Sequence, residues 1–182
     1  SRIAIGGGTP TFLSVIQLAS LFDALEHELG ASIHAVPASI ETSPDTITRD
    51  HARLIIDRGF NRISIGIQSF DEAEARDLGR PQSQKLAHSA LSLLRNCGTP
   101  CLNIDLIYGG RGQTEESWLR TIDDALQYQP EEIFLYPLYV RPLTGLNTLN
   151  RSWDDQRLTA YRIGRDRLLE VGYEQVSMRM FR

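Results

Sequence analysis

The feature that most constrains the fold is a pattern repeated along the chain: a short apolar segment, a turn rich in Gly, Pro or Asn, and an amphipathic segment. The short apolar segments predict strands, and the amphipathic segments predict helices. The predicted strands span residues 2–5, 32–40, 62–67, 101–108, 132–140 and 173–180. The predicted helices span residues 14–29, 46–58, 72–79, 83–97, 114–127 and 153–171. Units of this kind in series predict a parallel sheet with right-handed crossovers.

Two architectures fit this pattern, a doubly wound open sheet and a full or partial (β/α) barrel. An open sheet gathers its ligand-binding groups at one switch point, whereas a barrel gathers them at the carboxyl ends of many strands. Almost every predicted strand ends in glycines or polar side chains, and these are Gly6 to Thr9, Glu41, Gln68, Asp105, Tyr108, Tyr136 and Tyr139. We therefore expect an α/β fold, a partial (β/α) barrel of about five to six parallel strands with outer helices.

A glycine run follows the first predicted strand and reads Gly6-Gly7-Gly8-Thr9-Pro10. Glycines lose much conformational entropy on folding and add no packing, so the run indicates a backbone that approaches a ligand closely. Free amides at a strand end beside a helix start suit an anionic or carboxylate-bearing ligand. A tight strand-to-helix turn is the alternative. Neither the Walker motif nor the Gly-x-Gly-x-x-Gly motif is present at the run.

Four further side chains bring chemistry to the predicted strand ends and the loops that follow. The Glu41 carboxylate can accept hydrogen bonds from an ammonium group or a ribose hydroxyl, and the Gln68 amide can donate and accept. Arg80 can hold a carboxylate through two hydrogen bonds. Asp105 has apolar neighbours and therefore needs a partner or a ligand. The alternatives are a turn carboxylate for Glu41, a loop-fixing amide for Gln68 and a solvated side chain for Arg80.

Together these segments resemble the radical S-adenosylmethionine (SAM) superfamily, specifically its oxygen-independent coproporphyrinogen III oxidase-like (HemN/HemW-like) branch. The matching segments, in family order, are Gly6-Gly7-Gly8-Thr9-Pro10-Thr11, Glu41 with Pro44, residues 61–70, Leu78-Gly79-Arg80, residues 103–109 and Gly112-Gln113-Thr114. The resemblance implies that residues 1–182 are a radical SAM core. Members of this family cleave SAM reductively with a [4Fe–4S] cluster and form a 5′-deoxyadenosyl radical.

The resemblance implies seven cofactor-binding residues: Gly7, Gly8, Thr9, Glu41, Gln68, Arg80 and Asp105. The backbone of the glycine run would receive the methionine amino group of SAM, and Arg80 the methionine carboxylate. Glu41 would contact the amino-acid moiety or the ribose, and Gln68 and Asp105 the ribose or methionine polar groups. The implied partners are a small-molecule substrate, with a tetrapyrrole as one candidate, and an electron donor such as flavodoxin or ferredoxin.

The family holds its cluster with a Cys-x3-Cys-x2-Cys loop that lies upstream of the glycine motif. Cys97 and Cys101 have the first spacing, but no third cysteine follows and Cys101 begins a predicted strand. Three thiolates are the usual minimum for such a cluster, so we interpret both cysteines as structural or incidental. We expect the cluster cysteines upstream of Ser1, the core to lack its first strand and cluster loop, and the chain alone to be inactive.

The loops that set specificity differ from those of the porphyrin enzymes. Residues 109–112 read Gly-Gly-Arg-Gly where those enzymes usually read Gly-Leu-Pro-Gly. Arg111 and Arg141 are candidates for holding an anionic substrate, with solvated arginines as the alternative. The function therefore stays open between an oxidase-like enzyme, a haem-binding chaperone and a radical SAM methyltransferase. An unrelated barrel enzyme that binds a sugar phosphate is the alternative outside this family.

Composition narrows the classes of partner. A net charge of −4 implies no basic face for nucleic acid. No apolar run is long enough for a membrane-spanning helix, and two cysteines fit a reducing cytoplasm. The four histidines lack the spacing of a mononuclear metal site.

Overall fold

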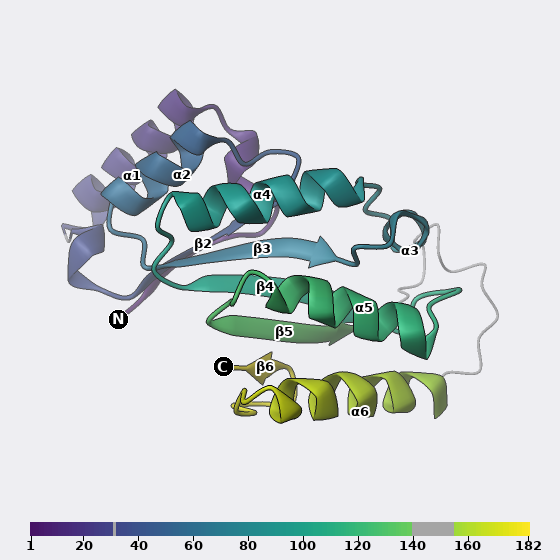
Figure 1. Cartoon of the computed structure of the whole chain (residues 1–182). Coiled ribbons are helices and arrows are strands. Elements are labelled where there is room, and N and C mark those ends of the chain that lie inside the picture. Colours follow the sequence, from purple (N-terminus) through teal and green to yellow (C-terminus); the bar gives the residue numbers. More distant parts are fainter. Residues whose placement is uncertain (31, 140–154) are drawn as a thin grey trace.

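The computed structural model describes residues 1–30, 32–139 and 155–182, and its centre is a six-stranded sheet (Figure 1). The strands are β1 (Ile3–Ile5), β2 (Ala38–Thr42), β3 (Arg62–Gln68), β4 (Leu102–Tyr108), β5 (Glu132–Pro137) and β6 (Met180–Phe181). They lie side by side in sequence order, with β1 to β5 parallel and β6 antiparallel to β5. The order never reverses, which excludes the doubly wound arrangement and confirms the predicted partial barrel.

Helices cover one side of this sheet, which we call the outer face (Figure 1). They are α1 (Val15–Leu29), α2 (Arg49–Asp57), α3 (Glu72–Asp77), α4 (Gln84–Asn96), α5 (Glu115–Leu126) and α6 (Asp155–Glu170), with short 3-10 helices η1 (Pro10–Phe12) and η2 (Ile33–Ala35). Hydroxyl caps fix the starts of four of them. Ser14, Thr48, Ser83 and Thr114 each accept a hydrogen bond from a backbone N–H in the first turn of the following helix.

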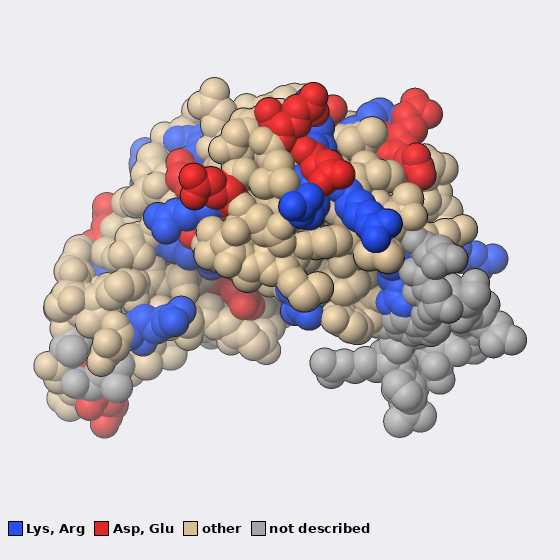
Figure 2. All heavy atoms as spheres, turned by 90° about the horizontal axis from the view of Figure 1, so that it is seen from below, with Lys and Arg blue, Asp and Glu red and all other residues tan. Residues whose placement is uncertain are grey.

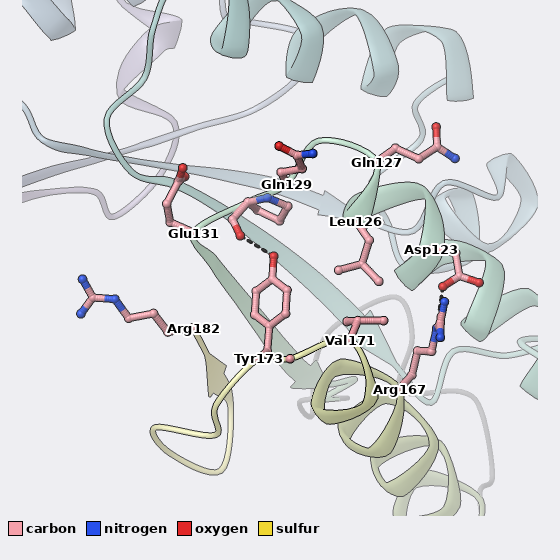
Figure 3. A pocket seen from close by; sticks show the side chains of 11 residues that line it. Asp123, Leu126, Gln127, Gln129, Glu131, Arg167, Val171, Tyr173 and Arg182 are labelled. Atoms are coloured by element: carbon pink, nitrogen blue, oxygen red, sulfur yellow. Dashed lines mark hydrogen bonds and ion pairs between the residues drawn. The ribbon is translucent and has the colours of Figure 1, made fainter.

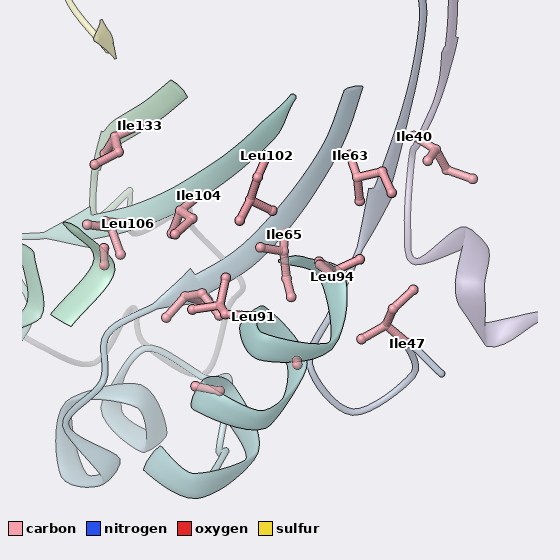
Figure 4. Packing of buried hydrophobic residues seen from close by; sticks show 14 of the residues in the cluster. Ile40, Ile47, Ile63, Ile65, Leu91, Leu94, Leu102, Ile104, Leu106 and Ile133 are labelled. Carbon is pink, nitrogen blue, oxygen red and sulfur yellow. The ribbon is translucent and has the colours of Figure 1, made fainter. Parts of the chain in front are cut away.

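The side chains along each strand alternate between the two faces of the sheet, so that apolar residues gather on one face and polar residues on the other. Ile63, Ile65 and Ile67 of β3 are fully buried and face the helices, where Leu91 and Leu94 of α4 pack against the sheet (Figure 4). The residues between them point to the opposite side of the sheet, which we call the inner face. On β3 and β4 that face carries the polar residues Arg62, Ser64, Gln68, Asn103 and Asp105. The helices are thus held by an apolar layer while the inner face stays polar.

Two predicted strands are wrong in their bounds. The segment predicted at 32–40 begins with η2, because the Ser32 hydroxyl accepts from the His34 N–H, and β2 starts only at Ala38. The segment predicted at 173–180 is mostly a turn that leads into the short, antiparallel β6, which pairs with β5. The predicted start of the last helix at 153, the predicted strand end at 140 and Arg141 lie outside the described residues.

Candidate functional site

The carboxyl ends of β1 and β2 bring the glycine run against Glu41. A methyl group added to Gly6 would lie 2.6 Å from the Glu41 carboxyl carbon and 2.7 Å from both its oxygens. Gly7 has a φ of +89°, and nothing described lies within 4 Å of a methyl group added to Gly7 or Gly8. The next residue, Thr9, is half-buried and accepts from the Phe12 N–H through its carbonyl. The run therefore presents open backbone directly beside a carboxylate.

Asp105 lies on the inner face of β4 with both carboxylate oxygens engaged. The Ser64 hydroxyl donates to Oδ2 at 3.1 Å, and the Asn103 amide donates to Oδ1 at 2.7 Å. Burial raises the pKa of Asp105 to about 6, although both donors and the charge of Arg62 lower it. The negative charge of Glu41 raises the pKa of Asp105 further.

Asn103 fixes this arrangement and leaves one atom without a partner. Its Nδ2 also donates to the Ser64 hydroxyl at 2.6 Å, so both amide protons are used by Ser64 and Asp105. The opposite amide orientation would turn Oδ1 toward a carboxylate and is excluded by repulsion. Oδ1 is therefore buried without a hydrogen-bond partner among the described residues. Such an atom is expected to meet a ligand or a water.

Gln68 ends β3 in a conformation that non-glycine residues seldom adopt. Its φ is +66°, and the pairing of β3 with β4 shifts register between Gly66 and Gln68. A methyl group on Gly66 would lie 2.6 Å from the Gln68 Nε2, so the amide folds back over the Gly66 backbone. Non-glycine residues with positive φ cluster at functional sites, where surrounding contacts hold them.

Arg80, like Gln68, forms no described hydrogen bond or ion pair with the other predicted site residues. It follows α3, where its backbone N–H donates to the Ala75 carbonyl at 2.9 Å. Its side chain is exposed and forms no ion pair with a described carboxylate. The structure thus groups the glycine run with Glu41, couples Glu41 electrostatically to Asp105, and leaves Arg80 on a neighbouring loop.

A cluster of Arg62, Glu132 and Phe134 on the inner face was not predicted from the sequence. Arg62 of β3 reaches past β4 to Glu132 of β5, with 2.6 Å between Nε and Oε2. The Arg62 guanidinium also lies 5.5 Å from the centre of the Phe134 ring. Alternation would have placed each of these three residues on the inner face, but their pairing joins positions 70 residues apart. Nothing local in the sequence reveals that pairing.

Sequence reasoning also missed a buried acid on the outer side. Glu74 of α3 is 5 % exposed and accepts from the Ser69 hydroxyl at 2.7 Å and from the Gln113 amide at 3.2 Å. The Ser117 hydroxyl of α5 donates to its other oxygen. Gln113 in turn accepts from the Gly109 N–H at 2.7 Å. This network ties the loops after β3 and β4 to α3 and α5.

The two cysteines precede β4, at the amino ends of the strands, whereas the glycine run follows β1 at the carboxyl ends. Cys97 ends α4, and Cys101 directly precedes β4, at the amino end of that strand. Burial, followed by the charge of Glu132, raises the pKa of the Cys101 thiol to about 11. Within the described ranges no group of three or more His, Cys, Asp or Glu residues could hold a metal ion. The described residues therefore do not fit an iron–sulfur cluster.

A separate groove of about 680 Å³ lies between the ends of α5 and α6 (Figure 3). Asp123 and Arg167 form an ion pair of 2.8 Å there, and the Tyr173 hydroxyl donates to the Pro130 carbonyl. Pro130 and Glu131 precede β5, so the groove is at the amino ends of the strands. It is therefore distinct from the glycine run and Asp105.

The surface seen from below in Figure 2 mixes the two signs of charge. Acidic and basic side chains alternate over this view and do not form a field of one sign. Among the described residues, no helix combines the length and the apolar character that crossing a bilayer requires.

The sequence of the chain is similar to those of known radical SAM proteins. Residues 1–125 match the family described as the Radical SAM superfamily. The chain is 34 % identical over 131 residues to oxygen-independent coproporphyrinogen III oxidase of Helicobacter pylori, covering 72 % of this chain and 29 % of that protein. It is 33 % identical over 142 residues to heme chaperone HemW of Bacillus subtilis, covering 78 % of this chain and 38 % of that protein.

A comparison with solved structures points to the same family. The structure of coproporphyrinogen III oxidase (HemN) from Escherichia coli, described as a radical SAM enzyme, superposes with a TM-score of 0.87 and 28 % identity. The match covers 100 % of this chain and 43 % of that chain. The chain thus spans less than half the length of these relatives. Family membership implies SAM and a [4Fe–4S] cluster as cofactors. The chain belongs to the radical SAM superfamily, in its HemN/HemW-like branch.

Proposed function

We propose that residues 1–182 are the SAM-binding core of a radical SAM enzyme of the oxidoreductase or transferase type, with coproporphyrinogen III oxidase-like chemistry as the first candidate. When bound, the [4Fe–4S] cluster of this family supplies the electron that cleaves SAM to a 5′-deoxyadenosyl radical. The described residues supply no cluster ligands. We therefore place those cysteines upstream of Ser1, outside this sequence, and attribute no catalytic step to the described chain alone.

The observation that carries the proposal is the contact between the glycine run and Glu41. The methionine end of SAM is a zwitterion, whose ammonium group requires acceptors and whose carboxylate requires donors. Open backbone at Gly7 and Gly8, beside the Glu41 carboxylate, offers acceptors for the ammonium group. The glycine at position 6 leaves the space that the Glu41 carboxylate occupies, so any larger residue would displace it.

The inner face supplies the partners of the ribose. Ser64 and Asn103 hold the Asp105 carboxylate, so its remaining lone pairs are presented in a fixed direction. A ribose diol donates two hydroxyl protons, which suits a carboxylate, and Gln68 adds an amide that donates and accepts. Arg80, on the loop after α3, is the donor proposed for the methionine carboxylate.

The likeness to a HemW protein favours a second candidate, a haem-binding chaperone. Both candidates share a SAM-type site in this core and differ in whether the bound tetrapyrrole reacts. Cytoplasmic location and a flavodoxin- or ferredoxin-like electron donor belong to the same proposal. A radical SAM methyltransferase of the same branch is the third candidate, which shares the SAM site.

Calorimetric titration of the 182-residue chain with SAM tests the core proposal. We expect saturable binding that Glu41→Ala and Asp105→Ala each weaken about tenfold, the effect of losing a hydrogen bond to a charged group. Arg120→Ala is the matched control, because Arg120 pairs with Glu116 on the exposed side of α5, away from the proposed site. Unchanged SAM affinity in both acid variants would contradict the site. Haem titration, followed by absorbance, separates the chaperone: stoichiometric haem binding without SAM binding would favour it.

A further inference from the structure

The last residue of β3, Gln68, is the middle residue of a strained turn. The Ser69 N–H donates to the Ile67 carbonyl at 2.8 Å, and the φ of Gln68 between them is +66°. A hydrogen bond between residues two apart, around a residue with positive φ, is the mark of a γ-turn of the rare, strained kind. Such a conformation costs free energy and persists only where the surrounding contacts hold it. The contacts made by Ile67 and Ser69 therefore decide whether Gln68 keeps this conformation.

One side chain, that of Gln82, donates to the backbone on both sides of Gln68. Gln82 lies on the loop between α3 and α4 and is half-buried. Its Nε2 donates to the Ile67 carbonyl and, at 3.3 Å, to the Ser69 carbonyl. A primary amide carries two N–H donors, so both donors of Gln82 are used on the turn. Gln82 thus joins the two ends of the turn from outside the strand.

A second set of contacts fixes the residue that follows Gln68. Ser69 is 1 % exposed, and its hydroxyl donates to the Glu74 carboxylate at 2.7 Å and accepts from the Asp71 N–H at 3.0 Å. The side-chain amide of Gln68, by contrast, forms no hydrogen bond with a described residue. The backbone of the turn is therefore held on both sides, while the amide at its centre stays available to a ligand.

The turn brings the Gln68 amide to the inner face beside Asp105. Gly66 pairs in register with Asp105, but Gln68 pairs with Leu106, so Ile67 is an extra residue on β3. An extra residue of this kind redirects the side chains next to it and is frequent beside active sites. The amide folds back over the backbone of Gly66, where an added methyl group would lie 2.6 Å from Nε2. Because Gly66 is the register partner of Asp105, the amide lies next to a residue proposed to bind SAM.

We propose that Gln82 is a positioning residue for SAM binding, which holds the strained turn at Gln68 so that the Gln68 amide stays on the inner face. This inference rests on the proposed function, which places Gln68 in the SAM site. Without the two hydrogen bonds from Gln82, the turn relaxes toward an ordinary backbone conformation, and the amide leaves the position beside Asp105. Both protons of the Gln82 amide are used on the turn, so Gln82 acts on SAM affinity through Gln68.

Calorimetric titration of the 182-residue chain with SAM tests this route. Gln82→Ala should weaken SAM binding about fivefold, and Gln68→Ala should weaken it by about as much. In the Gln68→Ala background, Gln82→Ala should cause no further loss, because the amide that Gln82 positions is already gone. Gln82→Glu keeps the shape but has no N–H donor, so it should weaken SAM binding at least as much as Gln82→Ala. Gln84→Ala is the matched control, since Gln84 is exposed and its side chain forms no hydrogen bond with a described residue.

Amide hydrogen exchange measures the turn itself, without any ligand. The Ser69 N–H closes the turn on the Ile67 carbonyl, so Gln82→Ala should speed its exchange about tenfold. The N–H groups of Ile63 and Ile65, earlier in β3, should exchange at the wild-type rate. This pattern separates a loosened turn from a loss of stability of the whole chain, which would speed the exchange of all three.

Three results would overturn the proposal. They are wild-type SAM affinity in Gln82→Ala, wild-type exchange of the Ser69 N–H in that variant, and a fivefold loss of affinity that persists in the Gln68→Ala background. The last result would show that Gln82 acts through another residue, such as Arg80 on the same loop. A wild-type chain that does not bind SAM would refute the proposed SAM core, while faster Ser69 exchange in Gln82→Ala would still support the role of Gln82 in holding the turn.

Discussion

Glu74, which is buried, and Asp105, which is half-buried, lie on opposite sides of the sheet and differ in how their hydrogen bonds are arranged. Glu74, on the helix side, accepts from Ser69, Gln113 and Ser117. These donors come from the loops after β3 and β4 and from α5. Asp105, on the inner face, has two donors among the described residues: Ser64 on the adjacent strand β3 and Asn103 on its own strand β4.

The two carboxylates differ in the direction from which their hydrogen-bond donors approach. The donors of Glu74 surround it and belong to separate segments, so the carboxylate joins them and has little exposed surface for a ligand. The donors of Asp105 approach along the inner face, where Asn103 also keeps an unpaired oxygen. A buried acid whose hydrogen bonds join distant segments contributes to stability. We propose that Asp105, whose donors lie along one face, contributes to ligand binding instead.

The largest effect is expected from Glu74→Ala. Its loss leaves the Ser69, Ser117 and Gln113 donors buried without their acceptor, and we expect the free energy of unfolding to fall by about 3 kcal/mol. Urea unfolding at pH 7 measures this change in the free energy of unfolding. Asp105→Ala is the comparison variant, with a far smaller loss of stability. Equal stability of Glu74→Ala and the wild type would show that Glu74 does not stabilise the fold.

Asp105→Asn should show the reverse pattern, with weaker SAM binding and no loss of stability. The side chain keeps its shape and loses the charge, and we expect SAM affinity to fall about tenfold. Burial disfavours the ionised carboxyl in the folded state, so removing the charge should raise stability at pH 7, by at most about 3 kcal/mol for the shift to about 6. Calorimetry and urea unfolding on the same protein measure both quantities. A destabilised variant with normal SAM affinity would reverse the comparison.

The pH dependence separates the two properties within the wild-type chain. The pKa of Asp105 is raised from 3.8 to about 6, so its neutral form favours folding. The stability contributed by this group is present below about pH 4 and is lost as the pH rises through about 6. SAM binding needs the ionised form, so affinity should fall about tenfold between pH 7.5 and pH 5. Asp105→Asn, titrated alongside, should lack this dependence, and a wild type without it would argue against a charged contact.

Gly6→Ala tests the role of the glycine run in SAM binding, and its expected effect is smaller than those of the acid substitutions. The added methyl group would lie 2.6 Å from the Glu41 carboxyl carbon, and the end of that flexible side chain must move away. We expect about a fivefold loss of SAM affinity with little change in the thermal unfolding midpoint. Gly110→Ala, outside the proposed SAM-binding residues, is the matched control, because its added methyl group would meet its nearest neighbour, Leu78, at an ordinary contact distance of 3.5 Å. Equal effects of the two substitutions would show that the Glu41 contact is not what matters.

The sequence predicted the parts of this comparison that depend on local pattern. Ile63, Ile65 and Ile67 alternate with polar residues, so β3 and its faces followed directly, and Asp105 was singled out by its apolar neighbours. Glu74 was missed because acids are common on exposed helices, and its burial depends on Ser117, 43 positions away.

The smallest effect is expected from the double substitution Cys97→Ser with Cys101→Ser. Both residues are half-buried at the amino end of β4, and burial raises the pKa of the Cys101 thiol to about 11, so it stays protonated at neutral pH. A protonated thiol is a poor ligand for iron. We expect SAM affinity to be unchanged, stability to fall by about 1 kcal/mol or less, and iron incorporation on reconstitution to be the same as in the wild-type chain. A specific loss of bound iron in the double variant would instead make these cysteines cluster ligands, and would place the cluster at the amino ends of the strands, away from the glycine run and Glu41.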